Sequence, residues 1–166
     1  FNESNKKIDS LIKENYKSQL LKKEAELAAY DLQLNPHFVL NTLNLINLAL
    51  IQNGNDDMSE IISALSRVIE YTLRTKSLQV LFSLDLANTQ NYLHIMQKRY
   101  KDKFTVKYEI SKELLSTKVP KLFLQPLVEN SIKHGFESIT WEGEIVIRAK
   151  CMDGLRIFEI EDNGSG

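Results

Sequence analysis

EIVIRAKCMDGLRIFEIE, residues 144–161, indicates the fold class most strongly. Apolar and polar residues alternate over 144–151 and again over 155–161, which is typical of half-buried β-strands. The two runs meet at Asp153-Gly154, a dipeptide that favours a tight β-hairpin turn. Residues 104–110 (FTVKYEI) alternate in the same way and predict another strand. With the helices expected around them, these runs predict an α+β fold whose mostly antiparallel sheet carries helices on one face.

Helical patterns dominate the chain before this sheet. Residues 3–34 contain no Gly or Pro, and Leu20, Leu27 and Leu34 recur every seven residues, which predicts a weak coiled coil. Apolar residues recur at helical spacing over 36–52 and 57–75, on either side of an Asn-Gly-Asn break. A lone helical hairpin has surplus apolar surface, so we expect it to pair with a second copy in a four-helix bundle.

Two more helices are expected in the second half of the chain. Ser83 is predicted to cap a helix over 84–101, and the segment that opens at Pro120 is predicted to become helical and end at Gly135. The sequence therefore divides into a helical linker (1–34), a helical hairpin (35–80) and an α/β region (81–166).

Composition excludes several classes of function. Of 166 residues, 21 are Lys or Arg and 22 are Asp or Glu, so no global charge favours nucleic acid. Cys151 is alone, which excludes an internal disulfide; we expect it to be a small buried residue. The most apolar stretch, 38–51, is too short to span a membrane. The chain opens inside a helical pattern and stops in a glycine-rich turn at Gly166, so we expect it to be part of a longer protein.

The first candidate site is centred on His37. His37, Asn41 and Asn44 fall on one narrow polar side of an otherwise apolar helix, which we expect to be mostly buried. Pro36 precedes the histidine and is expected to kink the helix. A neutral imidazole is a competent nucleophile. Alternatively, His37 is a structural residue at a kink.

Two more polar clusters lie downstream. Residues 120–137 (PKLFLQPLVENSIKHGFE) place Asn130, Lys133, His134 and Glu137 opposite an apolar face that includes Leu124, Leu127, Val128 and Ile132. An amide oxygen suits Mg²⁺, and a lysine can meet phosphates. Residues 161–166 (EDNGSG) supply a carboxylate for an exocyclic amine and glycines that allow close approach. The alternatives are an ordinary amphipathic helix and a surface loop.

Taken in order, four stretches resemble LytS/YesM-type sensor histidine kinases. LQLNPHFVLNTLNLI (32–46) resembles the phosphoacceptor motif, and YLHIMQKRYKDKF (92–104) resembles the signature before the first strand. Residues 119–137 resemble the asparagine box, and residues 161–166 resemble the first glycine box of the GHKL ATP-binding fold. The resemblance implies a dimerisation and phosphotransfer hairpin followed by an incomplete GHKL-type α/β sandwich.

The resemblance also implies a role for each matching residue. His37 would accept the γ-phosphoryl group of ATP and pass it to an aspartate in the receiver domain of a response regulator. Asn130 would bind Mg²⁺, and Lys133 and His134 would contact ATP, with Arg99 as a further phosphate contact. Asp162 would read the adenine amino group, and Gly164 and Gly166 would line the base pocket. The chain would be a homodimeric, cytoplasmic portion of a bacterial membrane protein, attached to the membrane only through regions outside it.

Three departures from the family pattern bear on activity. Phe38 follows the histidine where many histidine kinases carry an acid, so the general base stays open between Glu129, Asn41 and a water. Pro126 stands where GHKL ATPases often carry a glutamate, which argues against hydrolysis by an activated water. The ATP lid and second glycine box do not occur within residues 1–166, so we expect this chain alone to bind ATP poorly.

Two other functions are also compatible with the sequence. The first is a non-enzymatic dimerising scaffold with an incomplete nucleotide site, and the second is a GHKL ATPase of the chaperone or repair class. His94 and Trp141 are interpreted as structural residues.

Overall fold

The computed structural model describes residues 14–17, 19, 22–23, 36–101, 103–136 and 141–165. The predicted coiled coil falls largely outside these residues, including its three heptad leucines. The chain divides into two compact units, residues 1–39 and 40–166. The predicted domain boundaries at 34 and 80 therefore stay a prediction.

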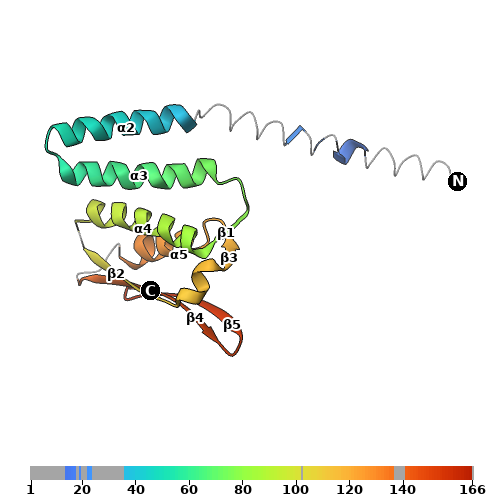
Figure 1. The fold of residues 1–166 in the computed structure, drawn as a ribbon. Helices are drawn as coiled ribbons and strands as arrows, with labels where there is room; N and C mark the ends of the chain where they lie inside the picture. Colours follow the sequence, from blue (N-terminus) through green and yellow to red (C-terminus); the bar gives the residue numbers. More distant parts are fainter. Residues whose placement is uncertain are drawn as a thin grey trace. The chain divides into compact units, whose positions relative to one another are not determined.

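A helical hairpin forms as predicted. It consists of α2 (Pro36–Gln52) and α3 (Asp56–Arg74) (Figure 1). The side chain of Asn55 caps α3 by accepting a hydrogen bond from the Met58 N–H at 3.4 Å. Within the hairpin, Asn47 bonds both Ser59 (2.7 Å) and Ser63 (3.1 Å), which ties α2 to α3.

The α/β region follows the hairpin. Its elements are β1 (Gln79–Leu81), α4 (Phe82–Arg99), β2 (Phe104–Ile110), the 3₁₀ helix η1 (Lys112–Ser116), β3 (Lys118–Pro120), α5 (Gln125–Asn130), the π-helix η2 (Ser131–Gly135), β4 (Gly143–Met152) and β5 (Leu155–Asp162). The prediction that Ser83 caps α4 is wrong. The helix starts at Phe82, two residues earlier than predicted, and the Phe82 N–H donates to the Thr117 carbonyl at 2.7 Å where β1 ends.

The strands form two sheets. β2, β4 and β5 lie in that order, with β2 parallel to β4 and β4 antiparallel to β5. β1 and β3 form a separate antiparallel pair. Two of these three pairings are antiparallel, which confirms the predicted α+β class. The predicted hairpin turn is also confirmed, since Asp153 (φ 53°) and Gly154 (φ 77°) both take the left-handed conformation that such turns require.

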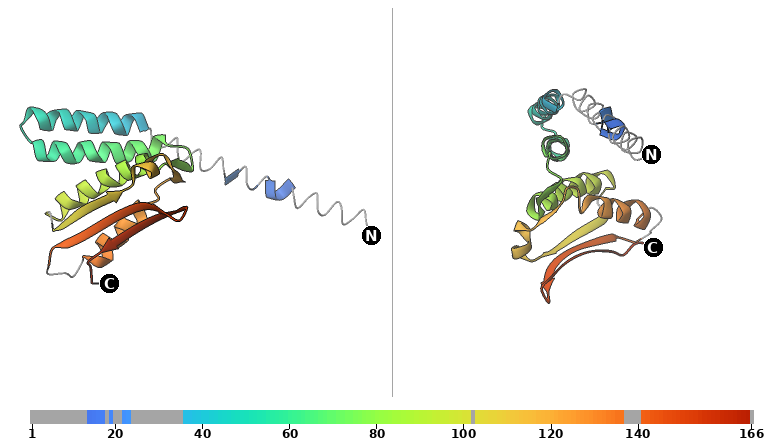
Figure 2. Two further views of the ribbon diagram at one scale, coloured as in Figure 1. Left: turned by 60° about the horizontal axis from the view of Figure 1, so that its bottom comes forward. Right: turned by 90° about the vertical axis from the view of Figure 1, so that its right-hand side faces the viewer.

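The core lies between this sheet and the helices α4 and α5, which cover one of its faces (Figure 2). Phe158 of β5 makes edge contacts with Phe82 (4.9 Å between ring centres) and Phe123 (5.2 Å). Arg148 pairs with Glu109 and Glu161 and so links all three strands. Apolar contacts with the helices therefore stabilise one face of the sheet, and ion pairs between the strands stabilise it further.

Cys151 is exposed, so the expectation that it is buried is wrong. Ile145, Ile147 and Ala149 precede it at alternate positions of β4 and are fully buried. Cys151 continues that alternation into the tip of the hairpin, where both neighbouring residues are exposed. Strand alternation alone does not show where the covering helices end.

Candidate functional site

His37 lies in the first turn of α2 and is exposed. Pro36 is the first described residue of α2. The predicted kink involves residues before Pro36, which lie outside the described residues. Asn41 and Asn44 are exposed on the same helix.

The expectation that this helix is mostly buried is wrong for a single chain. Leu40 is the buried residue of α2, whereas Leu45, Leu48 and Ile51 are 68%, 56% and 52% exposed. The hairpin therefore presents a large apolar surface.

The asparagine-box segment forms α5 and continues directly into η2. Leu124, Val128 and Ile132 are buried at four-residue spacing, and they fix which side of the segment faces the core. Asn130, Lys133 and His134 are exposed on the other side, as predicted from the sequence. Leu127 was placed on the apolar face, yet it is 49% exposed because it lies beside the buried row. A π-helical turn at this point fits the tendency of such turns to occur at functional sites.

The glycine-box segment packs against the end of η2. A Cβ at Gly164 would lie 2.4 Å from the Cα of Gly135, and a Cβ at Gly135 would lie 3.0 Å from Asp162 Oδ1. The Gly164 N–H donates to Asp162 Oδ1 at 3.0 Å, and the Ser165 N–H donates to the Gly135 carbonyl at 3.1 Å. The fold thus brings the Asp162 carboxylate beside the end of the asparagine box. Gly135 takes part in this contact, although the sequence analysis assigned it only the end of a helix.

Asn163 anchors the glycine-box segment from the other side. Its Oδ1 accepts from the Glu144 N–H at 2.7 Å, and its Nδ2 donates to the Glu142 carbonyl at 3.1 Å. Trp141 is 53% exposed and donates its indole N–H to the Asn163 carbonyl at 3.0 Å. These bonds orient Asp162 and Gly164, and they give Trp141 a positioning contact in place of the packing role expected from the sequence.

A buried carboxylate at Asp85 supports the start of α5, and the sequence analysis missed it. Asp85 is fully buried in α4 and accepts hydrogen bonds from the Tyr71 hydroxyl (2.8 Å) and from the N–H groups of Phe123 (3.2 Å) and Leu124 (3.0 Å). Burial, and next the hydrogen bond to Asp85, raise the pKa of Tyr71 well above its usual range. Leu122 has a positive φ of 60°, a strained conformation for a residue with a side chain. The Asp85 cluster therefore fixes an unusual backbone directly before α5.

Lys121 forms a second link between α3 and the segment that precedes α5. Its ammonium group donates to the Thr72 and Thr75 carbonyls at 2.7 and 2.6 Å, at the C-terminal end of α3. A cation at this end of a helix also interacts favourably with the helix dipole.

Glu129 and Arg99 both act electrostatically on Tyr92. The pKa of Tyr92 is raised to about 12, chiefly by burial and next by the charge of Glu129, while the charge of Arg99 opposes the shift. Glu129 accepts a hydrogen bond from Gln125 at 2.8 Å, and Arg99 stacks over Tyr100 at 5.7 Å. These two predicted site residues thus lie near the same tyrosine.

The donor set fits a magnesium–nucleotide site better than a protein-only metal site. Across the parts of the chain that the structure describes, no three His, Cys, Asp or Glu side chains converge as a metal cluster. Mg²⁺ with ATP needs few protein ligands because phosphate oxygens and waters complete its shell, and the exposed Asn130 amide suits that role. Gly166 and Glu137 lie outside the described residues, and His37 belongs to the compact unit that ends at residue 39.

The chain thus combines a helical hairpin that carries an exposed histidine with an α/β layer that carries the asparagine-box and glycine-box segments. Comparison with known proteins identifies the class to which this combination belongs. Residues 25–104 match the model of the histidine kinase family. The chain is 34% identical to sensor histidine kinase YesM of Bacillus subtilis over 161 residues, which is 97% of this chain and 28% of YesM. It is 37% identical to sensor histidine kinase YpdA of Escherichia coli over 145 residues (86% of this chain, 25% of YpdA). It is also 32% identical to sensor protein LytS of Staphylococcus saprophyticus over 177 residues (99% of this chain, 30% of LytS).

The chain belongs to the LytS/YesM-type sensor histidine kinases, as its motifs predicted. It spans between a quarter and a third of the length of these relatives. Within the described residues, no helix has the length and apolar character needed to cross a membrane.

Proposed function

We propose that this chain is the phosphotransfer and partial ATP-binding core of a two-component sensor kinase. It would support ATP-dependent phosphorylation of His37 and transfer of the phosphoryl group to a response-regulator aspartate. The observation that carries the proposal is the close contact of Gly164 and Asp162 with Gly135, which joins the motifs at residues 119–137 and 161–166 into one surface. The named relatives are sensor kinases, which supports the same class of activity.

The nucleotide would be held at its two ends by different segments. Asp162 Oδ1 already accepts the Gly164 N–H, and the second carboxylate oxygen can accept a hydrogen bond from the exocyclic amine of adenine. Asn130, Lys133 and His134 follow one another at helical spacing on the exposed side of α5 and η2, where they can meet phosphate oxygens. Bound Mg²⁺ would neutralise charge on those oxygens.

In the transfer step, an imidazole nitrogen of His37 would attack the γ-phosphorus while the bond to the ADP oxygen breaks. The leaving group is ADP, and the imidazole N–H proton is released to a base or to solvent. Phosphoryl transfer depends chiefly on positioning and charge neutralisation, so the protein needs few reacting groups. Glu129 is our candidate for a base, with Asn41 or a water as the alternatives.

Dimerisation through α2 and α3 follows from the apolar surface of α2. Three large aliphatic side chains of α2 are more than half exposed in a single chain. A parallel copy of the hairpin would bury them in a four-helix bundle. We further propose that the chain lies on the cytoplasmic side of a bacterial membrane sensor, where a response regulator is available.

The test is binding of a fluorescent ATP analogue with Mg²⁺ by the full-length protein. Binding should be lost, or weakened at least about tenfold, in Asn130→Ala, which corresponds to about 1.4 kcal/mol. Asn44→Ala, an exposed asparagine on α2, is the matched control and should bind normally. Equal affinity of Asn130→Ala and the unchanged protein would contradict the assignment of Asn130.

A further inference from the structure

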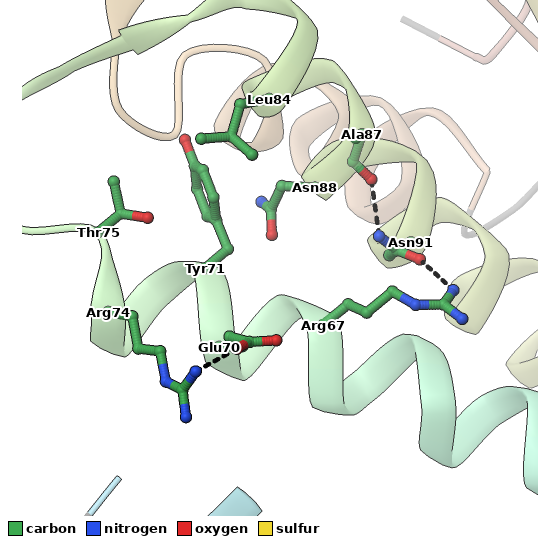
Figure 3. A pocket seen from close by; sticks show the side chains of 9 residues that line it. All are labelled: Arg67, Glu70, Tyr71, Arg74, Thr75, Leu84, Ala87, Asn88 and Asn91. Carbon is green, nitrogen blue, oxygen red and sulfur yellow. Dashed lines mark hydrogen bonds and ion pairs between the residues drawn. The ribbon is translucent and has the colours of Figure 1, made fainter.

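A cavity of about 360 Å³ lies between α3 and α4, away from the segments assigned to ATP (Figure 3). Its lining residues follow the spacing of a helix contact face on both helices. On α3 and just beyond its end they are Arg67, Glu70, Tyr71, Arg74 and Thr75; on α4 they are Leu84, Ala87, Asn88 and Asn91. Contact faces between helices are normally apolar and close-packed. Here charged and amide side chains occupy much of both rows, and the cavity remains between them.

The cavity contains a buried acceptor without a protein partner. Asn88 is 3% exposed, and its Oδ1 is the one buried side-chain oxygen or nitrogen, among the described residues, that has no hydrogen-bond partner. A buried acceptor without a partner is unfavourable, because it has lost its hydrogen bonds to water. Figure 3 shows this oxygen directed toward α3.

The orientation of the Asn88 amide is fixed by a chain of hydrogen bonds. The Glu129 carboxylate can only accept, so Gln125 donates to it through Nε2 at 2.8 Å. Gln125 Oε1 is then the acceptor for Asn88 Nδ2, at 3.0 Å. Exchanging the oxygen and nitrogen of Asn88 would set two acceptors against each other. Its nitrogen therefore faces Gln125, which leaves its oxygen on the side of the α3 residues that line the cavity.

The rim of the cavity is cationic and its wall is partly apolar. Arg67 donates to the neutral Asn91 amide at 3.2 Å, whereas Arg74 pairs with Glu70 at 2.7 Å, so the lining carries a net positive charge. Leu84, Ala87 and the Tyr71 ring supply apolar surface between this rim and Asn88. A ligand that matches all three features has a donor at one end, a flat apolar body and an anion at the other end.

We propose that the cavity binds a small aromatic carboxylate that carries a hydroxyl group opposite the carboxylate. The hydroxyl donates to Asn88 Oδ1, the ring packs against Tyr71 and Leu84, and the carboxylate meets Arg67. A volume of 360 Å³ lies within the range of about 300 to 1,000 Å³ that is usual for small-molecule sites. The proposal does not depend on the kinase assignment. The Asn88–Gln125–Glu129 chain would, however, connect an occupant to the residue next to Asn130.

Titration of the ¹⁵N-labelled chain, followed by NMR, tests this site with 4-hydroxybenzoate as the probe. We expect saturable shifts in the signals of α3 and α4 lining residues, and a shift of the Gln125 side-chain amide. Benzoate lacks the donor, and 4-hydroxybenzamide lacks the charge. Each should bind at least about tenfold more weakly, as expected for the loss of one good interaction.

Three variants locate the binding. Ala87→Leu fills the cavity without removing a polar group and should abolish the shifts, and Arg67→Gln should weaken binding about tenfold. Arg156→Gln is the matched control, because Arg156 is exposed on β5 and outside the cavity. Arg67→Gln also keeps the test decisive if Ala87→Leu does not fold.

Three results would overturn the proposal. Equal affinity for benzoate would mean that Asn88 does not take part. Unchanged binding in Ala87→Leu and Arg67→Gln would mean that the probe binds elsewhere. Absence of saturable shifts up to the solubility of the probe would mean that the cavity holds only ordered water.

Discussion

At the scale of single residues, Gly164 and Gly135 pack backbone against backbone beside the Asp162 carboxylate. Any Cβ at Gly164 would meet backbone atoms of Gly135 at 2.4 and 2.7 Å, and the backbone cannot give way as a flexible side chain can. This contact holds the glycine-box segment on the end of the asparagine box. It therefore links a steric requirement to the proposed adenine site.

Gly164→Ala should lower the free energy of unfolding by about 1 to 3 kcal/mol, the usual cost of overpacking. The full-length variant should also bind the ATP analogue less tightly. Chemical denaturation and analogue binding measure the two effects. Ser165→Ala is the control, since Ser165 contributes its backbone N–H to the contact with Gly135. Unchanged stability and affinity in Gly164→Ala would show that the two segments do not pack as described.

Tyr71 is the second residue on which the site depends, because its hydroxyl bonds the buried Asp85 carboxylate. Tyr71→Phe removes this donor and keeps the ring. It should lower the free energy of unfolding by about 1.5 to 3 kcal/mol, the range for hydrogen bonds to charged groups. Denaturant unfolding at neutral pH measures it, with Tyr108→Phe, a partly exposed tyrosine on β2, as the matched control. Equal stabilities of the two variants would contradict this role for Tyr71.

At the scale of elements, α2 is a helix with a large exposed apolar surface, which a partner helix would cover. Leu45→Glu places a charge within its exposed apolar surface and should convert a dimer into a monomer, because burying an unpaired carboxylate is unfavourable. Size-exclusion chromatography with light scattering measures the mass. Gln52→Glu adds the same charge at the exposed end of α2 and should remain dimeric. A monomeric unchanged chain, or a dimeric Leu45→Glu, would argue against the bundle.

Elements with strong local signals were predictable from sequence. The alternation over 144–161 and the Asp-Gly turn specify a hairpin locally, and the structure has β4 and β5 with that turn. The parallel pairing of β2 with β4 was not predictable, because it joins Phe104 to Gly143 across η1, β3, α5 and η2.

The candidate site divides in the same way between local and long-range features. The exposed row of Asn130, Lys133 and His134 follows from helical spacing alone. The contact of Gly135 with Gly164 and the hydrogen bonds from the Phe123 and Leu124 N–H groups to Asp85 depend on tertiary packing, and no spacing rule indicates them. The polar cavity between α3 and α4 likewise needs the register of two helices, which the sequence alone does not supply.

At the scale of the whole molecule, two partly buried tyrosines make stability depend on alkaline pH. Burial raises the pKa of Tyr92 and of Tyr108 to about 12, from an ordinary value of 10.0. The unfolded chain ionises these phenols first, so their contribution to stability is complete below pH 10 and is lost between pH 10 and about 12.

Denaturant midpoints measured at intervals from pH 8 to 12 test this dependence. The midpoint should fall above pH 10, and the fall should be shallower in Tyr92→Phe, which has no phenol to ionise. The same slope in Tyr92→Phe and the unchanged chain would contradict a shifted pKa for Tyr92.

Phosphorylation of His37 is the central claim, and incubation of the full-length protein with γ-radiolabelled ATP and Mg²⁺ tests it most directly. The account predicts an acid-labile, base-stable label on the protein that is absent from His37→Gln. His94→Gln is the matched control and should be labelled normally, because His94 lies on α4 beside Glu60 and has no assigned role in transfer. A label of the same stability that persists in His37→Gln would contradict the account.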